Sequence, residues 1–369
     1  MKGRGRCSAN GCGRARDSRR RLAGLAALLL IAAASVRGEP GVPGFPAFGP
    51  APRTEAGRFA NPIGDLDHGS FGVRWGFMWR RLGTAFRSGA GHPARVANDG
   101  AFLRENARHS EPTVTWIGHA TLLVQMEHVS FLTDPIWSER PSPISFLGPK
   151  RFVAPGLEIE DLPPIDFVVI SHNHYDHLDL RTLKKLAKRS PETLFYVPLG
   201  NAGLLRKAGI TNVVELDWGD RVSFEGATIH CLPTQHWSKR GLADDQKALW
   251  ASWAVTGPER RFYFAGDTGF FDGFEGIGEG LGPFDLVAVP IGAYAPRAMM
   301  KASHMDPEEA WRAAVALGAR RAIAMHFGTF DLSDEPLDEP PRRFRAAAAG
   351  TSAAEPRAWI LDIGETRQF

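Results

Sequence analysis

Short apolar runs separated by polar turns dominate the chain from Thr113 onward, and this pattern is typical of β-strands. Predicted strands occupy residues 114–126, 129–133, 167–170, 194–197, 213–216, 227–232, 250–255, 261–265, 286–290 and 322–325. Stretches with apolar side chains at helical spacing lie between several of them, at residues 179–189, 201–208, 271–280 and 307–317. Because the early strands follow one another directly and the later ones alternate with helices, we expect two sheets with helices on the outside.

The first 38 residues have the pattern of an export signal. A basic region precedes an apolar run from Leu22 to Ala34, and small residues follow, so we expect cleavage after Ala34 or after Gly38. Residues 18–22 (Ser-Arg-Arg-Arg-Leu) also resemble the start of a twin-arginine signal. We therefore expect an exported protein, periplasmic or membrane-associated. If this segment is an uncleaved N-terminal anchor or follows a mis-assigned start codon, we expect the protein at the cytoplasmic membrane face.

Two further segments precede the regular pattern. Residues 39–53 contain five prolines, which predicts an extended, semi-rigid linker. Residues 54–112 form a polar N-terminal extension with one apolar stripe at helical spacing, made of Phe71, Trp75, Met78 and Trp79. Aromatic stripes usually pack into a core, so we expect this helix to pack on the main domain. The alternative is an amphipathic segment that rests on a membrane surface.

Composition agrees with one catalytic domain over residues 113–369. The chain has 369 residues, 43% of them hydrophobic, which excludes a mostly disordered protein. No apolar run reaches the roughly 18 residues of a membrane-spanning helix, and three cysteines without a Cys-x-x-Cys pair exclude a zinc ribbon. Residues 1–38 hold nine of the 44 Lys and Arg but one of the 41 Asp and Glu, so the remaining chain has a net charge of −5. We therefore expect no nucleic-acid partner.

The main chemical signal is the segment Ser-His-Asn-His-Tyr-Asp-His at residues 171–177, which directly follows a predicted strand. It places four imidazole or carboxylate donors, His172, His174, Asp176 and His177, within six residues. Such donors suit a metal such as zinc. A loop that leaves a strand end can aim several of them at one point, which a straight strand cannot. The segment therefore predicts a metal site rather than a solvated histidine-rich loop.

Three more candidate ligands lie at the ends of other predicted strands: His236, Asp267 and His326. Any one of them alone is more often a structural residue, because an Asp after a glycine usually marks a turn and a strand-end His is often only hydrogen-bonded. Their recurrence after three separate strands favours a shared metal site.

The order His-x-His-x-Asp-His, followed by a spaced His, Asp and His, resembles that of the metallo-β-lactamase superfamily. The resemblance implies an α/β fold, a four-layer αβ/βα sandwich with two divalent metal ions, most simply Zn²⁺, at one edge between two sheets. It further implies that His172, His174 and His236 hold one metal, that Asp176, His177 and His326 hold the second, and that Asp267 bridges them.

Segments outside these ligands resemble the N-acylphosphatidylethanolamine-hydrolysing phospholipase D family. They lie at residues 131–136, 148–152, 235–237, 290–294, 304–310 and 364–367. This resemblance implies a dinuclear metal-dependent phospholipase D that releases N-acylethanolamine and phosphatidic acid by attack of a metal-bridging hydroxide. The expected partners are a phospholipid substrate and a membrane surface, with a homodimer left open. The alternatives are a hydrolase of the same fold acting on another phosphodiester or a lactone, and a non-catalytic protein, against which the complete ligand set argues.

Asp176 and His304 are the predicted catalytic residues. His304 directly precedes a predicted helix, in which Asp306 is the N-cap, Pro307 the first helical residue and Glu309 the capping-box partner. The family resemblance places His304 at the substrate phosphate, where an imidazole can bind an oxygen or donate a proton. The alternative is a loop histidine without a catalytic role.

Four further residues have predicted supporting roles. The resemblance implies that Asp134 holds a metal-bound histidine in place, as carboxylates often do, and that His119 serves similarly. Tyr175 lies in the metal-binding segment and Tyr294 in a segment that resembles the phospholipase family, so both are candidate substrate-binding residues. Each of the four has a plain structural role as its alternative.

Overall fold

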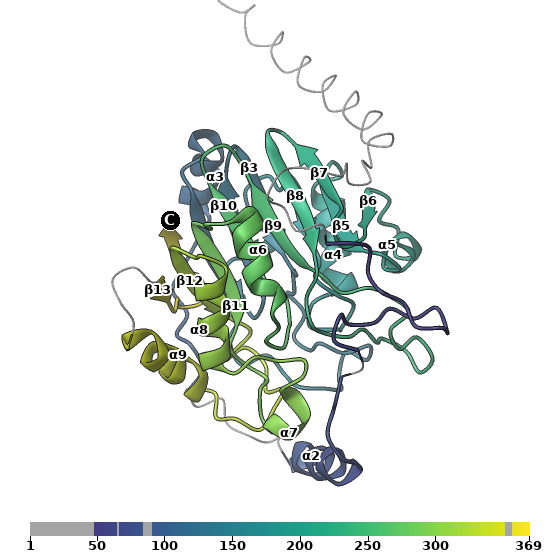
Figure 1. Ribbon diagram of the computed structural model, residues 1–369. Coiled ribbons are helices and arrows are strands. Elements are labelled where there is room, and N and C mark those ends of the chain that lie inside the picture. The colour runs from purple at the N-terminus through teal and green to yellow at the C-terminus, as the bar shows by residue number, and fades with distance from the viewer. Residues whose placement is uncertain (1–47, 65, 84–90, 351–355) are drawn as a thin grey trace, which may run out of the picture.

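The computed structural model describes residues 48–64, 66–83, 91–350 and 356–369 (Figure 1). The predicted export signal and most of the predicted linker lie outside these residues. Two seven-stranded sheets pack face to face, and helices cover the outer face of each. The predicted α/β fold, a four-layer αβ/βα sandwich, is therefore confirmed.

The first sheet has the strand order β14-β1-β2-β3-β4-β5-β6. Its strands are β14 (Thr366–Gln368), β1 (Thr113–Gly118), β2 (Thr121–Met126), β3 (Val129–Thr133), β4 (Phe167–Val169), β5 (Leu194–Pro198) and β6 (Val213–Leu216). Strands β14 to β3 are antiparallel neighbours, whereas β3 to β6 run parallel. Parallel strands need crossovers, and two of these contain α4 (Leu180–Arg189) and α5 (Ala202–Lys207).

The second sheet has the order β13-β12-β11-β10-β9-β8-β7. Its strands are β7 (Arg221–Phe224), β8 (Ala227–Leu232), β9 (Ser252–Thr256), β10 (Arg261–Phe264), β11 (Leu286–Pro290), β12 (Arg321–Met325) and β13 (Arg357–Trp359). Strands β7 to β10 pair antiparallel and β10 to β13 pair parallel. The helices on this side are α6 (Gly273–Leu281), α8 (Pro307–Ala316) and α9 (Glu339–Ala349) (Figure 1).

The core follows the alternation of side chains along the strands. In β4, Phe167 and Val169 point between the two sheets, whereas Val168 joins the cluster beneath α4 and α5. Phe131 stacks on Phe167 at 4.7 Å between ring centroids and meets Phe262 of the other sheet at 5.6 Å. This aromatic contact packs the two sheets against each other and so helps to hold their strand ends in position.

The observed elements differ from the predicted ones where local patterns are weak. Residues 114–126, predicted as one strand, form β1 and β2 with a tight turn at His119, whose φ is 54°. Strands β7, β13 and β14 and helices α3 (Ala101–His109) and α9 were not predicted. Each of these strands has three or four residues, too few for a periodic pattern to stand out.

The N-terminal extension packs on the core in part. Phe59 is 1% exposed, and its backbone N–H donates to the carbonyl of Gln246 at 2.9 Å. Helix α3 also packs on the core through the buried Leu103. The described end of the predicted linker is likewise held, because the N–H of Ala51 donates to the Asp217 carboxylate at 3.0 Å.

The apolar stripe of the extension behaves differently. Helix α2 (Phe71–Gly83) forms as predicted, but Phe71 is 71% exposed, Trp75 46%, Met78 55% and Trp79 59%. The expectation that this stripe packs on the main domain is therefore wrong. The helix contacts α7 (Arg297–Met300), which lies beside it in Figure 1. Within the part of the chain that the structure describes, no helix has the length and apolarity needed to cross a membrane.

Candidate metal centre

The predicted ligands converge because strands from both sheets end at one edge of the sandwich. The loop at residues 171–179 leaves β4, His236 follows β8, Asp267 follows β10 and His326 follows β12. Strands β8, β10 and β12 run in the same direction, since β8 and β10 are both antiparallel to β9. Their carboxyl ends therefore lie at the same edge of the sheet, as is usual for sites in open sheets.

The first group contains the side chains of His172, His174 and His236. Nδ1 of His174 lies 2.8 Å from Nε2 of His172 and 3.3 Å from Nε2 of His236. A tetrahedral zinc ion with Zn–N bonds of about 2.0–2.1 Å separates its nitrogens by about 3.3 Å, so the group fits such an ion. Nδ1 of His236 donates to the carbonyl of Ser303 at 3.0 Å. This bond leaves the lone pair of Nε2 directed at the centre of the group.

Burial keeps this first group uncharged. It lowers the pKa of His174 to about 4 and that of His172 and His236 well below the ordinary value. Neutral imidazoles with free lone pairs are the form that binds a metal.

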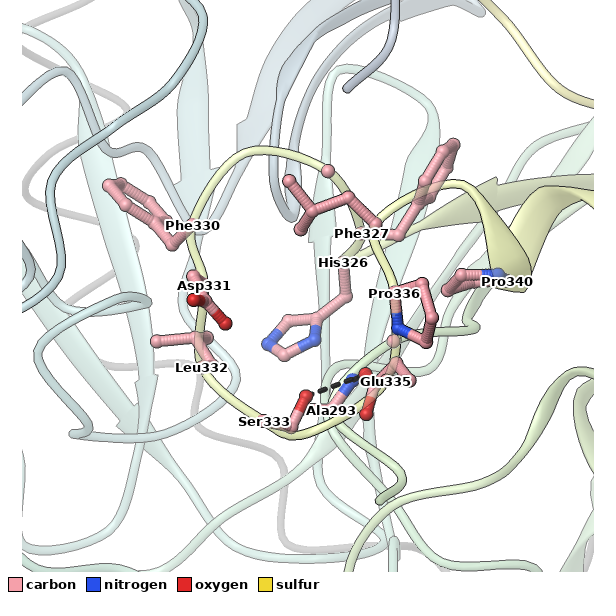
Figure 2. A pocket seen from close by; sticks show the side chains of 13 residues that line it. Ala293, His326, Phe327, Phe330, Asp331, Leu332, Ser333, Glu335, Pro336 and Pro340 are labelled. Atoms are coloured by element: carbon pink, nitrogen blue, oxygen red, sulfur yellow. Dashed lines mark hydrogen bonds between the residues drawn. The ribbon is translucent and has the colours of Figure 1, made fainter. Parts of the chain in front are cut away.

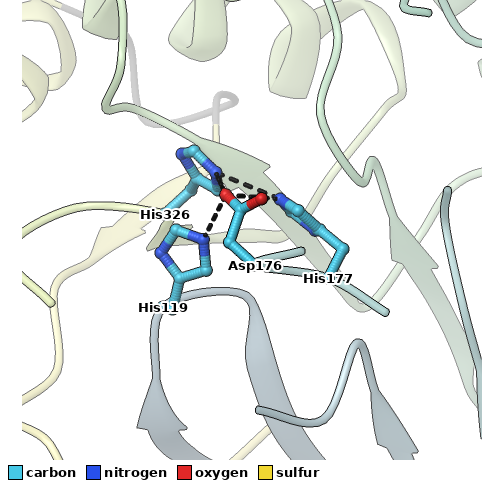
Figure 3. A group of neighbouring side chains, drawn as sticks. All are labelled: His119, Asp176, His177 and His326. Atoms are coloured by element: carbon cyan, nitrogen blue, oxygen red, sulfur yellow. Dashed lines mark hydrogen bonds and ion pairs between the residues drawn. The ribbon is translucent and has the colours of Figure 1, made fainter. Parts of the chain in front are cut away.

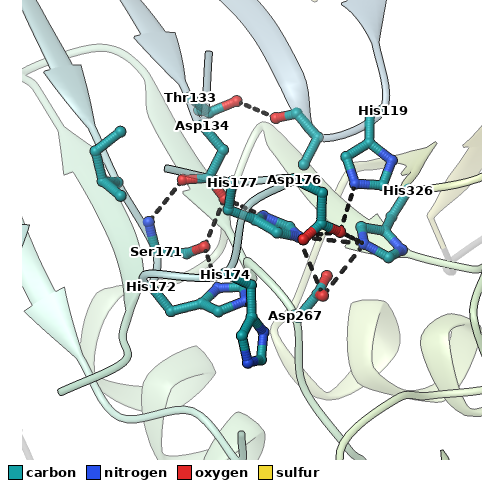
Figure 4. Close-up of polar contacts among 12 residues, drawn as sticks. His119, Thr133, Asp134, Ser171, His172, His174, Asp176, His177, Asp267 and His326 are labelled. Atoms are coloured by element: carbon teal, nitrogen blue, oxygen red, sulfur yellow. Dashed lines mark hydrogen bonds and ion pairs between the residues drawn. The ribbon is translucent and has the colours of Figure 1, made fainter. Parts of the chain in front are cut away.

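The second group contains Asp176, His177 and His326, with His119 beside them (Figure 3). Asp267 also lies against the two histidines of this group (Figure 4). Nε2 of His177 lies 3.2 Å from Nε2 of His326, and both lie 3.4–3.5 Å from Oδ2 of Asp176. Oδ2 of Asp267 is 3.1 Å from His177 and 3.2 Å from His326. The other oxygen of Asp267 is buried and has no hydrogen-bond partner among the described residues. Such an orphaned acceptor fits a cation that lies between the two groups.

The electrostatics of the second group also favour a cation. Burial opposes a positive charge on His177, but the carboxylates of Asp267, Asp176 and Asp134 outweigh it and hold its pKa well above the ordinary value. For His326 the balance is similar, because Asp267 and Asp176 overcome burial and raise the pKa to about 9. Buried carboxylates thus draw positive charge to this position, and a divalent cation would satisfy them.

Two of the predicted supporting residues contact the ligands directly (Figure 4). Oδ2 of Asp134 accepts a 2.6 Å bond from Nδ1 of His177, while Oδ1 accepts from the N–H of Ser171. Nε2 of His119 lies 3.0 Å from Oδ2 of Asp176. His119 therefore supports a candidate ligand as predicted, through the Asp176 carboxylate, and its ring also lies 4.1 Å from that of His326 between centroids.

A cavity of about 310 Å³ opens above both groups. His174, Asp176, Asp267 and His326 lie on its floor, and apolar side chains including Trp237, Met299, Met300 and Leu332 form its walls. No lysine or arginine lines it among the described residues. The cavity thus combines a polar floor with walls suited to a lipid-like ligand.

His304 lies on this cavity, and the predicted capping box is present in α8. The Asp306 side chain accepts from the N–H of Glu309, whose side chain accepts from the N–H of Asp306. Nδ1 of His304 lies 3.9 Å from Oδ2 of Asp267. Burial, partly offset by Asp267, lowers the pKa of His304 to about 4, so its imidazole is neutral at pH 7.

Of the two predicted substrate-binding tyrosines, one lines the cavity and the other does not. Tyr175 lines the cavity, and its hydroxyl donates to the carbonyl of Arg240 at 2.9 Å. Tyr294 does not line it: its hydroxyl donates to Glu339 at 2.6 Å, and the Arg343 guanidinium covers its ring. The prediction of substrate contact therefore finds no support at Tyr294, where α9 covers the hydroxyl and the neighbouring Ala293 lines the cavity.

Two residues that support the centre were not predicted. Asn61 of the extension pairs with the backbone of His236, donating to its carbonyl at 2.9 Å and accepting from its N–H at 3.1 Å. Arg240 donates to the carbonyls of Asn173 and Leu178 at 2.9 and 2.8 Å, and so holds both ends of the metal-binding loop. Neither residue belongs to a motif, so no signal in a single sequence indicated it.

A second, smaller pocket lies behind His326 (Figure 2). Its wall is the loop at residues 327–337, in which Glu335 accepts from the N–H groups of Ala293 and Ala295 at 2.6 and 3.0 Å. The hydroxyl of Ser333 also donates to Glu335, at 2.6 Å. These bonds tie the loop after His326 to the segment after β11.

Comparison with known proteins agrees with this geometry. The sequence profile described as "Beta-lactamase superfamily domain" matches residues 130–327. N-acyl-phosphatidylethanolamine-hydrolyzing phospholipase D 1 of Caenorhabditis elegans is 47% identical over 246 residues, which are 63% of this chain and 69% of that protein. The mitochondrial N-acyl-phosphatidylethanolamine-hydrolyzing phospholipase D of Saccharomyces cerevisiae is 34% identical over 263 residues, 69% of this chain and 55% of the yeast protein.

Among solved structures, the isothiocyanate hydrolase from Delia radicum gut bacteria resembles this chain with a TM-score of 0.54 and 27% identity. The match covers 70% of this chain and 98% of that structure. The sandwich is therefore shared with an enzyme of different named activity, so the fold does not specify the substrate.

Proposed function

This chain is a metal-dependent hydrolase of the beta-lactamase superfamily, in the family of N-acylphosphatidylethanolamine-hydrolysing phospholipases D, and we propose that its substrate is N-acylphosphatidylethanolamine. The products are N-acylethanolamine and phosphatidic acid. The observation that carries the proposal is the convergence of seven candidate ligands beneath a cavity with apolar walls. The polar floor suits a phosphodiester, and the walls suit the rest of a lipid.

We propose two zinc ions as the cofactor. His172, His174 and His236 would hold one, and Asp176, His177 and His326 the other, with Asp267 between them. When bound, two divalent cations lower the pKa of coordinated water and neutralise negative charge on the phosphodiester. That neutralisation matters here because no lysine or arginine lines the described cavity.

The protein's own residues would position the reaction. His304 lies on the cavity, and its neutral imidazole would donate a hydrogen bond to a phosphoryl oxygen. His119 holds the Asp176 carboxylate in place on the cavity floor, and Asp134 does the same for the His177 ring. Attack of water at phosphorus breaks the bond to the ethanolamine oxygen. That oxygen takes up one proton and leaves as N-acylethanolamine, while phosphatidic acid keeps the phosphate.

We further propose that α2 rests on a phospholipid bilayer. Its aromatic and methionine side chains face solvent, and such side chains partition into the boundary between headgroups and acyl chains. The helix is next to the substrate cavity, since His68, which closely precedes it, lines that cavity. A bilayer is also where a phospholipid substrate is found. The proposed periplasmic or membrane-associated location rests on residues 1–38 alone.

The test is to incubate the full-length, metal-loaded protein with N-acylphosphatidylethanolamine in detergent micelles and to identify the products by mass spectrometry. We expect N-acylethanolamine and phosphatidic acid, both lost when a chelator removes the metals. A protein that holds two metals and does not turn over this lipid would contradict the substrate assignment. A screen of other phosphodiesters and lactones would then identify the substrate.

A further inference from the structure

Helix α2 and the residues just before it contact two segments that line the substrate cavity, α7 with Met299 and Met300 and the loop that carries Leu332. At its N-terminal end the chain approaches α7 closely at Gly69, whose φ is 74°. A Cβ atom there would lie 2.5 Å from the carbonyl oxygen of Ala298, so only glycine fits at this contact. The next two residues of α7, Met299 and Met300, line the cavity.

The C-terminal end of α2 is held by two arginines. Arg80 pairs with Asp334 at 2.7 Å, and Arg81 pairs with Asp331 at 2.8 Å. Arg81 also donates to the carbonyl of Ser333 at 2.5 Å and to the carbonyl of Asp331. Leu332, which lies between these acceptors, lines the cavity. One helix and its N-terminal approach therefore contact both α7 and the loop at residues 327–337, each of which lines the cavity.

Of the two arginines, Arg81 is held more firmly against the loop than Arg80. The side chains of Arg81 and Asp331 are 18% and 9% exposed, whereas Arg80 is 51% exposed. A half-buried guanidinium with several acceptors is held more firmly than a solvated pair. A lysine has no planar fork with which to reach the same set of acceptors.

The loop that Arg81 contacts is itself internally braced. The Ser333 hydroxyl donates to Glu335, which accepts from the N–H of Ala293 (Figure 2). Glu335 also accepts from the N–H of Ala295. A shift at Asp331 would therefore move Leu332 together with its neighbours rather than be absorbed locally.

We propose that Arg81 is a positioning residue that couples the lipid-facing helix α2 to the Leu332 wall of the substrate cavity. When α2 rests on a bilayer, the Arg81–Asp331 contact steadies the loop at residues 327–337 in the shape that accepts a lipid. The described contacts of Arg81 with Asp331 and Ser333 involve no candidate metal ligand. The inference deepens the proposed function, because it assumes that α2 meets a lipid surface.

The direct test measures hydrogen exchange by mass spectrometry in the full-length protein, with and without vesicles of phosphatidylethanolamine and phosphatidylglycerol. In the wild type we expect vesicles to slow exchange several-fold both in residues 71–83 and in residues 327–337. In Arg81→Met we expect slowing in residues 71–83 alone. The proposal would be overturned if vesicles did not slow exchange in residues 327–337 of the wild type. It would also be overturned if they slowed it equally in Arg81→Met.

Kinetics supply a second readout, with Arg342→Met as the matched control. Arg342 forms an exposed pair with Asp338 on α9 and does not line the cavity. For Arg81→Met we expect KM for N-acylphosphatidylethanolamine in vesicles to rise about tenfold, the effect of losing one good polar contact. We expect metal content and hydrolysis of the soluble bis(4-nitrophenyl) phosphate to stay unchanged.

These outcomes separate the two proposals. Loss of metal in Arg81→Met, or equal losses on both substrates, would mean that the contact supports the metal centre and not the lipid wall, which overturns the inference. If the wild type does not hydrolyse the lipid but vesicles still protect the loop through Arg81, the proposed substrate fails and the coupling stands. Arg81→Lys should behave like Arg81→Met, because one ammonium group cannot replace the fork.

Discussion

At the scale of single residues, Asp267 is the candidate ligand that lies between the two proposed metal positions. Its carboxylate faces both histidines of the second group with one oxygen, while the other has no partner among the described residues. We predict that Asp267→Asn lowers metal content below two ions per chain and abolishes hydrolysis, because a neutral amide cannot balance two cations. Elemental analysis and product detection check this. Asp285→Asn, a buried carboxylate paired with Arg320 away from the site, is the control that should keep both metals.

His304 is expected to act on the substrate rather than on the metals. We predict that His304→Ala retains both metals but lowers kcat about 100-fold or more, the range for losing a positioned acid–base or hydrogen-bonding group. The exposed His128, which contacts Ser110, supplies the control variant His128→Ala. Unchanged turnover in His304→Ala would make His304 a structural residue.

At the scale of elements, the metal-binding loop depends on Arg240. Removing this guanidinium frees the carbonyls of Asn173 and Leu178 and uncovers the Tyr175 ring. We predict that Arg240→Met weakens metal binding about 10–100-fold, as is typical when a partner of the ligands is lost. Chelator competition measures the affinity. Arg189→Met is the control variant, because Arg189 also donates to two backbone carbonyls, those of Leu162 and Pro163. This variant should leave metal affinity unchanged.

The exposed stripe of α2 makes a separate prediction about lipid binding. The double variant Trp75→Ser and Trp79→Ser should lower binding to phospholipid vesicles at least tenfold, because each lost indole removes about 1.5–3 kcal/mol of apolar burial. Vesicle sedimentation measures it. Phe102→Ser is the control, since Phe102 is a 53% exposed aromatic on α3. Equal binding of wild type and double variant would exclude α2 as the membrane contact.

At the scale of the whole molecule, a buried histidine away from the metal centre predicts how stability depends on pH. Burial, with help from Arg221 and Arg261, lowers the pKa of His230 to about 4, below the 6.5 of an unfolded histidine. Between pH 6.5 and about 4, His230 therefore binds a proton in the unfolded chain but not in the folded chain. This contribution to stability is present above pH 6.5 and lost as the pH falls towards 4.

At pH 5 this pKa difference of His230 is expected to lower the free energy of unfolding by about 2 kcal/mol. We predict that the free energy of unfolding of His230→Gln falls by about 2 kcal/mol less than that of the wild type between pH 7.5 and pH 5. Glutamine can still bond the Thr256 hydroxyl, which His230 contacts at 3.0 Å. Urea unfolding at both pH values measures the difference. Parallel declines in the two proteins would contradict the assignment.

Much of the fold was readable from local patterns. Alternating and continuous apolar runs predicted most of the strands, because a strand buried on one or both faces needs them. The capping box of α8 was visible as Asp306, Pro307 and Glu309, since it depends only on residues within one turn. The short strands β13 and β14 were missed because their pairing with β12 and β1 comes from distant parts of the chain.

The candidate site divides in the same way. All seven predicted ligands meet in the structure, because each follows an apolar strand and strands of one direction end at one edge. Their binding of metal stays a prediction. The contact of Asn61 with His236, 175 positions later, and of Arg81 with Asp331, 250 positions later, had no signal in the sequence.

The sequence by itself determined which side chains can hold metals, where most of the longer strands and helices lie, and that α2 has an apolar stripe. Only the tertiary structure decided that this stripe faces solvent, that Tyr294 is covered by α9, and that the extension reaches the metal centre through Asn61. The physical reason is that local patterns follow from neighbours within a few residues. Which surface a segment covers depends on how separate layers pack, and that is set by contacts between residues far apart in the chain.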